Sequence, residues 1–202
     1  MLEIGKYHNL QVIKKLDFGV YLQGEENEEI LLPRAYITDE LKIDDYIEVF
    51  IYRDSEDRVI ATTLKPFAIV NDFAYLQVKS VNKTGAFLDW GLPKDLMVPF
   101  REQKEKMIEG KYYLVKIYLD SITDRIVASA NIRRFLGGDI SVLHEGQKVD
   151  IIIYDKTELG YNVIINSEFL GLVYKMKYSK EFPQVKKLLD MLKSSEKTGK
   201  LI

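Results

Sequence analysis

The chain has 202 residues, of which 47% are hydrophobic and 30% charged, a composition typical of a globular protein. It contains no cysteine, which excludes disulfides, a thiol nucleophile and cysteine-ligated metal sites. No apolar run approaches the roughly 20 residues that span a bilayer, and the N-terminal sequence does not have the pattern of a secretory signal. We therefore expect a cytoplasmic protein that makes no contact with a membrane.

The net charge of −2 is unevenly distributed along the chain. Residues 1–74 carry 8 basic and 15 acidic side chains, a balance of −7. Residues 75–138 carry 11 basic and 7 acidic side chains, a balance of +4, and residues 139–202 carry 10 and 9, a balance of +1. The middle third is thus the segment that best suits an anionic partner.

Five short apolar runs occupy the first third of the chain, and polar turns separate them. The runs are LQVIKKL (10–16), GVYL (19–22), EILLP (29–33), YIEVFIY (46–52) and RVIAT (58–62). They are rich in β-branched and aromatic residues, and side chains alternate between apolar and polar in several of them. Five such strands predict a small barrel or sandwich over residues 1–66.

The same order of runs recurs further along the chain, over residues 73–135. FGVYL is followed by TGAFLDW (84–90), EEILLPR by DLMVPFR (95–101), and YIEVFIYRDSEDRVIAT by YYLVKIYLDSITDRIVAS (112–129). The interval from Gly19 to Gly85 is identical to the interval from Pro33 to Pro99. Equal spacing at two separated points predicts a second barrel built like the first.

A third, partial copy is predicted over residues 140–202. Gly146 and Gly160 repeat the interval between Gly5 and Gly19, and Tyr174 follows Gly160 at the same interval, in the place of the proline. Where two more strands would follow, residues 182–195 carry leucine and valine at helical spacing. We expect three strands of a barrel followed by a short C-terminal helix, with linkers near 64–74 and 135–142.

These segments resemble known domains. FGVYL (18–22), LLPR (31–34) and DSEDRVIAT (54–62) resemble an OB-fold barrel of the kind named the S1 domain, after a ribosomal protein. The segment GAFLDWGLPKDLMVPFREQ (85–103) resembles the second tandem domain of the conserved virulence factor B family of bacteria. That family joins several S1-type barrels to a C-terminal winged helix and acts in RNA-binding regulation. The resemblance covers residues 1 to about 175 and does not include a winged helix.

The resemblance implies an RNA site on each barrel. S1-type domains hold RNA with two aromatics around the strand-two glycine, a strand-three histidine, and an Asp and an Arg at the last turn. The corresponding residues are Phe18, Tyr21, Pro33, Asp54 and Arg58 in repeat one; Thr84, Phe87, Pro99, Asp120 and Arg125 in repeat two; and Leu159, Asn162 and Tyr174 in repeat three. No repeat carries the full set.

Strand alternation places the key aromatic of repeat two independently of any family. In AFLDW, Phe87 and the charged Asp89 share one face, while Ala86, Leu88 and Trp90 share the other. We therefore expect Phe87 on the solvated face, either stacking on bases or plugging a barrel end, and the resemblance favours stacking. Trp90 is expected to pack in a core or a turn.

Basic side chains near that face could meet phosphates. The candidates expected to lie close to it are Lys83, Arg101, Lys104, Arg125, Arg133 and Arg134. For the run REQKEK (101–106), a solvated helical face with Arg101 paired to Glu105 is the favoured alternative.

The residues give little support to catalysis. The two histidines, His8 and His144, lie near opposite ends of the chain, and neither has the spacing of a metal ligand. No nucleophile elbow and no phosphate-binding glycine loop occurs. We expect no enzymatic activity, no cofactor, no metal and no small-molecule substrate.

The resulting prediction is an all-β protein of tandem OB-type barrels that binds single-stranded RNA reversibly as a bacterial post-transcriptional or virulence-type regulator. The predicted RNA-binding residues are Phe18, Tyr21, Arg58, Lys83, Phe87, Arg101, Arg125 and Tyr174. Two alternatives stay open: a protein–protein adaptor built on the same barrels, and a glycan-binding barrel. Self-association through the incomplete third barrel is a further expectation.

Overall fold

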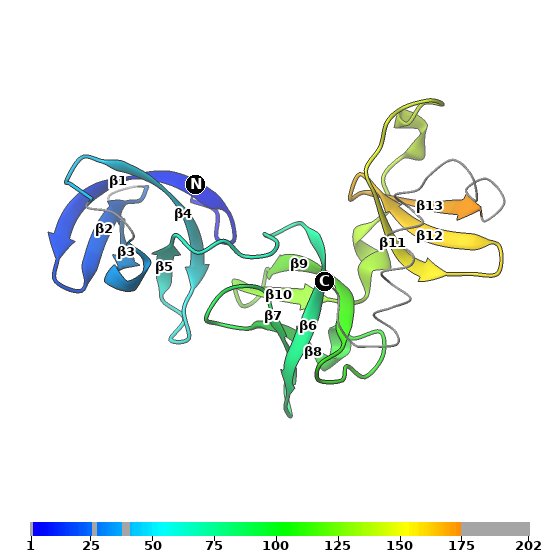
Figure 1. Ribbon diagram of the computed structural model, residues 1–202, viewed down its shortest axis with the longest axis horizontal. Helices are drawn as coiled ribbons and strands as arrows, with labels where there is room; N and C mark the ends of the chain where they lie inside the picture. The colour runs from blue at the N-terminus through cyan, green and yellow to red at the C-terminus, as the bar shows by residue number, and fades with distance from the viewer. Residues whose placement is uncertain (1, 26–27, 38–40, 175–202) are drawn as a thin grey trace.

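The computed structural model describes residues 2–25, 28–37 and 41–174, and Figure 1 shows their path. Strands dominate these residues, and the helical segments within them are four short 3-10 turns. The turns are η1 (Arg34–Tyr36), η2 (Phe100–Glu102), η3 (Ile132–Phe135) and η4 (Ile140–Val142). The all-β prediction is confirmed, while the predicted helix over 182–195 lies outside the described residues.

The first repeat is a closed five-stranded barrel. Its strands are β1 (Tyr7–Leu16), β2 (Gly19–Gln23), β3 (Glu29–Pro33), β4 (Tyr46–Arg53) and β5 (Val59–Thr62). They close in the order β1-β2-β3-β5-β4, with β3 and β5 parallel and the other pairs antiparallel. Closure leaves no free sheet edge, which is how small barrels avoid unwanted strand pairing.

The second repeat closes in the same way. Its strands are β6 (Phe73–Val81), β7 (Gly85–Asp89), β8 (Leu96–Pro99), β9 (Tyr112–Asp120) and β10 (Arg125–Ser129). The order β10-β8-β7-β6-β9 matches that of barrel one strand for strand, including the parallel pair β8 and β10. The two barrels predicted from the spacing of the repeats are confirmed.

The third repeat forms an open sheet of three strands. These are β11 (Ile151–Lys156), β12 (Gly160–Ile165) and β13 (Phe169–Tyr174), paired antiparallel in chain order. They correspond to the first three strands of a barrel, as the partial repeat predicted.

One glycine recurs at the start of the second strand of every repeat, for a steric reason. Gly19 pairs with Pro33, Gly85 with Pro99 and Gly160 with Tyr174 across the second and third strands. A Cβ at any of these glycines would lie less than 3.0 Å from a carbonyl oxygen of the third strand, closer than real Cβ atoms come. Only glycine allows so close an approach, and this explains why the glycine recurs at a fixed interval in the sequence.

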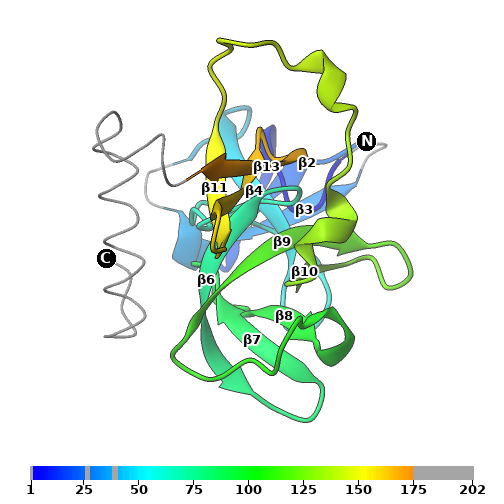
Figure 2. The same ribbon diagram turned by 90° about the vertical axis from the view of Figure 1, so that its right-hand side faces the viewer.

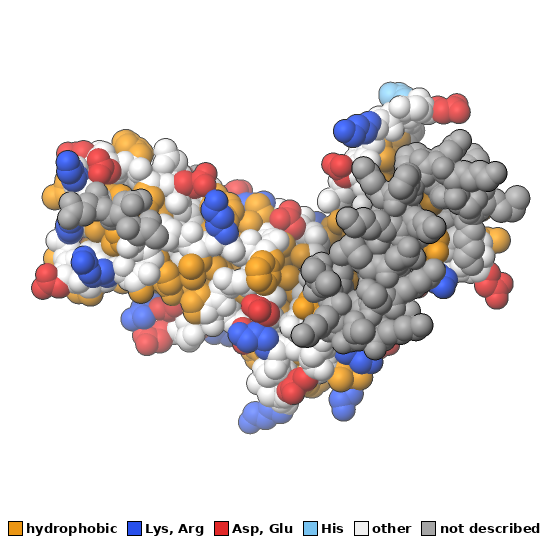
Figure 3. Space-filling view, in the orientation of Figure 1, with side chains coloured by type: hydrophobic (Ala, Val, Ile, Leu, Met, Phe, Trp, Pro, Cys, Tyr) orange, Lys and Arg blue, Asp and Glu red, His pale blue; other side chains and the backbone are white. Residues whose placement is uncertain are grey.

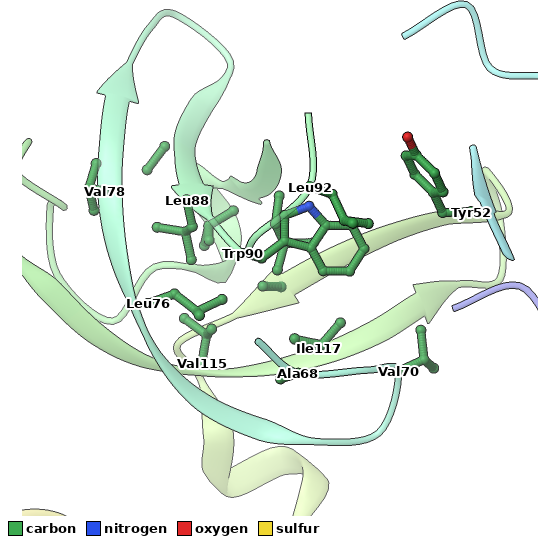
Figure 4. Close-up of a cluster of buried hydrophobic side chains, with 14 of the residues drawn as sticks. Tyr52, Ala68, Val70, Leu76, Val78, Leu88, Trp90, Leu92, Val115 and Ile117 are labelled. Carbon is green, nitrogen blue, oxygen red and sulfur yellow. The ribbon is translucent and has the colours of Figure 1, made fainter. Parts of the chain in front are cut away.

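Barrels one and two share an apolar core. Phe50 and Tyr52, on the outer face of β4, join the same buried cluster as the interior of barrel two. Trp90 belongs to this cluster and is 2% exposed (Figure 4). Its ring centroid lies 5.9 Å from that of Phe50. Its indole N–H donates to the Lys94 carbonyl oxygen at 2.6 Å. The core or turn position expected for Trp90 is confirmed, and the two barrels are docked through it.

The third sheet lies on the side of barrel two away from barrel one in Figure 1, and Figure 2 views it from that side, with β11 near β6. Phe73, Ile132 and Ile164 form a small buried cluster there. The Tyr75 hydroxyl on β6 donates to the Ile153 carbonyl oxygen on β11 at 2.9 Å. This contact is smaller than the junction between the barrels, and it leaves a cleft beside it.

Candidate nucleic-acid interface

Barrel one presents two aromatic rings on its outer face. Phe18, in the turn between β1 and β2, is 56% exposed, and Tyr21 on β2 is half-buried. Their ring centroids are 6.3 Å apart at an interplanar angle of 86°. Lys14, which pairs with Tyr21 across β1 and β2, places its Nζ 5.4 Å from the tyrosine ring centroid. Two rings and a cation on one exposed sheet surface can bind stacked bases and a phosphate.

A second cation lies at the same end of barrel one. The Arg34 backbone N–H donates to the Phe18 carbonyl oxygen at 2.9 Å, so the exposed Arg34 lies beside the turn that carries Phe18. The predictions from sequence included neither Lys14 nor Arg34. The alternation of β1 contained the signal for Lys14, because its position opposite Tyr21 follows from the hairpin register.

Arg58 pairs with acidic residues of its own turn. Its guanidinium donates to the Asp54 carboxylate at 2.6 and 2.9 Å, and it contacts Glu56 at 2.9 Å. Burial would raise the pKa of Asp54, but the hydrogen bonds from the Arg58 side chain and backbone outweigh it and hold that pKa below its usual value. Arg58 remains 64% exposed, so one side of its guanidinium is open to a ligand.

In barrel two, the strand faces are as predicted from alternation. Ala86 and Leu88 are fully buried in the core, while Phe87 is half-buried on the outer face. Phe87 pairs with Met97 on β8 and lies in a groove of about 620 Å³. Residues of barrel one form the opposite wall of this groove, among them Tyr52 and Asp57. The ring therefore lies at the junction of the barrels and is less exposed than Phe18.

Arg125 forms an ion pair with barrel one, whereas Arg58 pairs with an aspartate of its own turn. Repeat two has one extra residue between Asp120 and Arg125, and the Arg125 guanidinium pairs with Asp57 of barrel one. Lys94 contacts the same carboxylate at 3.2 Å, and Arg53 contacts Asp124 at 2.6 Å. The hydrogen bond from Arg125, followed by that from Lys94, lowers the pKa of Asp57. The Asp–Arg pair that the resemblance implied is thus present in barrel one, whereas in barrel two Arg125 forms an inter-barrel ion pair instead.

The remaining predicted residues are dispersed. Lys83 lies exposed in the turn between β6 and β7 and makes no ion pair within the described part of the chain. Tyr174 is 53% exposed at the end of β13. The structure therefore brings Phe18 and Tyr21 together, and Phe87 and Arg125 together, but gathers no single site from all eight residues.

The expectation for the run 101–106 is wrong. These residues form no α-helix, and Arg101 contacts Asp120 at 3.5 Å rather than Glu105. Residues 100–102 form the 3-10 turn η2, which buries the Glu102 side chain against Arg134 at 2.9 Å, so the run is not a solvated face along its whole length.

Three of the cations expected near Phe87 lie elsewhere. Lys104, Arg133 and Arg134 line the cleft between barrel two and the third sheet. The sequence could not show this, because the cleft is formed by elements from two repeats.

Within the described ranges, no cluster of histidine, aspartate and glutamate is arranged to hold a metal ion, and no helix is long and apolar enough to span a membrane. Figure 3 shows hydrophobic side chains gathered over the junction of the barrels, with acidic and basic groups interspersed around them. The surface seen there is a mixture of both charges rather than a continuous basic face.

Comparison with known proteins supports the predicted resemblance. A sequence model described as the S1 domain matches residues 4–64. The protein YitL of Bacillus subtilis is 34% identical over 95 residues, which are 46% of this chain and 32% of YitL. Conserved virulence factor B of Staphylococcus aureus is 26% identical over 123 residues, 58% of this chain and 41% of that protein. The chain spans less than half the length of these curated relatives.

Among solved structures, a multidomain protein with nucleic acid binding domains from Streptococcus pneumoniae is similar to this chain with a TM-score of 0.55. The sequences are 20% identical, and the match covers 88% of this chain and 65% of that one. The similarity confirms the tandem barrel fold.

Proposed function

We propose that this chain binds single-stranded RNA reversibly, without catalysing a reaction. The premise is that residues 4–64, which match the S1 domain, form such a domain. One observation carries the proposal: Phe18 and Tyr21 form an edge-to-face pair on the outer face of barrel one, with Lys14 over the tyrosine ring. Both rings lie where a barrel would not place apolar side chains for its own stability, because the interior is filled by residues such as Val20 and Leu22.

The groove around Phe87 forms a second, weaker part of the same surface. Its ring can stack on a base, but Asp57 already neutralises the nearest cations, Arg125 and Lys94. We therefore expect modest affinity at each barrel. With about three phosphate contacts in all, log affinity should fall with log salt at a slope of roughly −2.

The named relatives suggest the biological setting. Because some of them are called conserved virulence factor B, we propose a post-transcriptional regulator that acts in the bacterial cytoplasm. The proposal also includes self-association, since the outer edges of β11 and β13 are unpaired within the described residues. Light scattering over a concentration series tests this part, and a monomer at every concentration would contradict it.

Fluorescence anisotropy with a labelled 12-nucleotide RNA tests the RNA proposal. Tyr21→Leu keeps the apolar bulk but removes the stacking ring, so affinity should fall by a factor of about 5 to 150, as for one lost stacked base. Tyr46→Leu is the matched control, because Tyr46 is a 64% exposed tyrosine at the start of β4, which β1 separates from β2. Equal losses in both variants would refute the assignment of the site.

The adaptor hypothesis keeps one observation in its favour. Barrel one belongs to the segment with a balance of −7, which does not attract a phosphate backbone. If the wild-type chain binds no RNA at low salt, the adaptor function replaces the RNA-binding function.

A further inference from the structure

A cleft of about 840 Å³ lies between barrel two and the third sheet. Strands β6 and β9 and the turn η3 contribute one wall, and β11 contributes the other. The side chains that could recognise a ligand there are four tyrosines and five charged groups: Tyr75, Tyr112, Tyr113, Tyr154, Lys104, Glu105, Arg133, Arg134 and Asp155. This cleft is separate from both barrel faces described above. None of the eight residues predicted to bind RNA lines it, whereas Lys104, Arg133 and Arg134, which were expected near Phe87, do.

Two of the four tyrosines use their hydroxyls in hydrogen bonds within the protein, and two do not. The Tyr75 hydroxyl is bound to the Ile153 carbonyl oxygen, and burial raises the pKa of Tyr75 to about 12. The Tyr113 hydroxyl accepts a hydrogen bond from the Ile108 N–H at 3.2 Å. Tyr112 and Tyr154 are half-buried, and their hydroxyls have no hydrogen-bond partner among the described residues. The Tyr154 ring also packs against the buried cluster of Phe73, Ile132 and Ile164, so only part of it faces the cleft. The rings of Tyr112 and Tyr154 are therefore placed on opposite walls of the cleft with their polar ends unused.

Of the three cations of the cleft, one forms contacts within the protein and two do not. Arg134 is engaged, since it pairs with Glu102 at 2.9 Å and lies over the rings of Tyr118 and Phe135. Its neighbour Arg133 and the nearby Lys104 are exposed and form no ion pair within the part of the chain that the structure describes. Two cations without ion pairs, beside two half-buried rings that line the same cleft, provide the contacts that a phosphate backbone and its bases require.

The cleft also contains two acidic residues, which suit a different part of a nucleic acid. Glu105 and Asp155 are both exposed, and they balance the formal charge of Lys104 and Arg133. Carboxylates are acceptors for the amino groups of cytosine, adenine and guanine, so they suit the edges of bases rather than phosphates. The mixture of charges argues for a short segment with its bases inserted, and against a purely electrostatic contact with a duplex.

We propose that this cleft is a second site for single-stranded RNA, in which bases stack on Tyr112 and Tyr154 and phosphates contact Lys104 and Arg133. The proposal rests on the RNA-binding function above, and it adds a site that spans two repeats. A strand bound here would cross from barrel two to the third sheet and hold them together.

Anisotropy with a fluorescein-labelled 12-nucleotide oligoadenylate tests the cation contacts on the full chain. In the double variant Lys104→Ala/Arg133→Ala, the salt slope should decrease in magnitude by about 1.4, the share of two single-strand phosphate contacts. The matched control is Lys106→Ala/Lys111→Ala, which removes two exposed lysines of the same barrel that do not line the cleft. An equal change of slope in both double variants overturns the site, because the effect would then be general charge.

A second pair of variants tests stacking. Tyr112→Phe keeps the ring and should bind within about twofold of wild type, whereas Tyr112→Leu should bind at least about fivefold more weakly. Melting curves of both variants show whether the barrel stays folded.

The outcomes separate the two proposals. If Tyr21→Leu weakens binding while every cleft variant binds like wild type, the cleft site is refuted and the proposed function stands. If wild type itself does not bind the oligonucleotide, both proposals fail.

Discussion

Phe87 and Leu88 are adjacent residues of β7 that face opposite sides of barrel two. Leu88 is fully buried and belongs to the shared core, whereas Phe87 lies half-buried in the junction groove. Alternation in the sequence predicted these two faces, and the structure confirms them. The pair therefore allows folding and the proposed RNA binding to be tested separately with single side chains.

We expect Leu88→Ala to lower the free energy of unfolding by about 2–5 kcal/mol, because it leaves a cavity in a packed core. Phe87→Ala should cost less stability than Leu88→Ala but weaken RNA binding by a factor of at least about 5. Urea melts and anisotropy on the same two variants measure both effects. A Phe87→Ala variant that unfolds while Leu88→Ala stays folded would show that stacking is the wrong role for this ring.

At the scale of elements, the hairpins of all three repeats depend on one close backbone approach. Gly85 faces the Val98 carbonyl oxygen, which would lie less than 3.0 Å from a Cβ at this position. We expect Gly85→Ala to force β7 and β8 apart. Its loss in free energy of unfolding should exceed that of a glycine-to-alanine change in an open turn. Gly110→Ala is the control, since Gly110 has φ +79° but no atom within 4 Å, so only backbone strain of about 1–2 kcal/mol applies. Thermal melts of the two variants measure the loss of stability. Equal losses would contradict the steric explanation.

The third sheet is the element that we expect to open first. The buried cluster at its contact with barrel two is small, formed by Phe73, Ile132 and Ile164, and its own described strands do not close into a barrel. Sub-global opening requires less free energy where few apolar contacts are lost. Hydrogen exchange should therefore be faster for amides of β11–β13 than for those of β1–β10. Equal protection across all three units would show that the sheet is stabilised by more than this cluster.

At the scale of the whole molecule, the junction of barrels one and two combines an apolar core with ion pairs on its rim. Trp90 is the one tryptophan of the chain and is buried there, so its fluorescence reports on the docking of the barrels. Around it, Asp57 accepts from Arg125 and Lys94. The apolar contacts supply most of the stability, because exposed ion pairs contribute little each.

The ion pairs should make this junction sensitive to acid. Hydrogen bonds from Arg125 and Lys94 lower the pKa of Asp57 below its ordinary 3.8. A lowered pKa in the folded state adds stability above about pH 4 that is lost as the pH falls through the lowered value. Asp57→Asn should therefore be less stable than wild type near neutral pH, with the difference vanishing in strong acid. Urea midpoints from Trp90 fluorescence measure this, and a difference that is independent of pH would exclude Asp57 as the cause.

The sequence by itself determined the local architecture of this protein. Recurrent spacing of glycine and proline located the repeats, because the close approach of the second and third strands permits only glycine at that position. Alternation assigned Phe87, Leu88 and Trp90 to their faces, since a strand turns successive side chains to opposite sides. The exposed aromatic pair of barrel one followed from the same pattern and from the family resemblance.

Only the tertiary structure decided which charged groups remain free and which rings meet. Arg125 lies across from Asp57, which belongs to the other barrel and is distant in the chain, so its ion pair depends on how two barrels dock. Tyr112 and Tyr154 come from different repeats, and the cleft that holds them exists only because the third sheet rests against barrel two. Short-range patterns encode strand faces and hairpin registers, whereas contacts between separate barrels depend on the fit of whole surfaces, which no local spacing records.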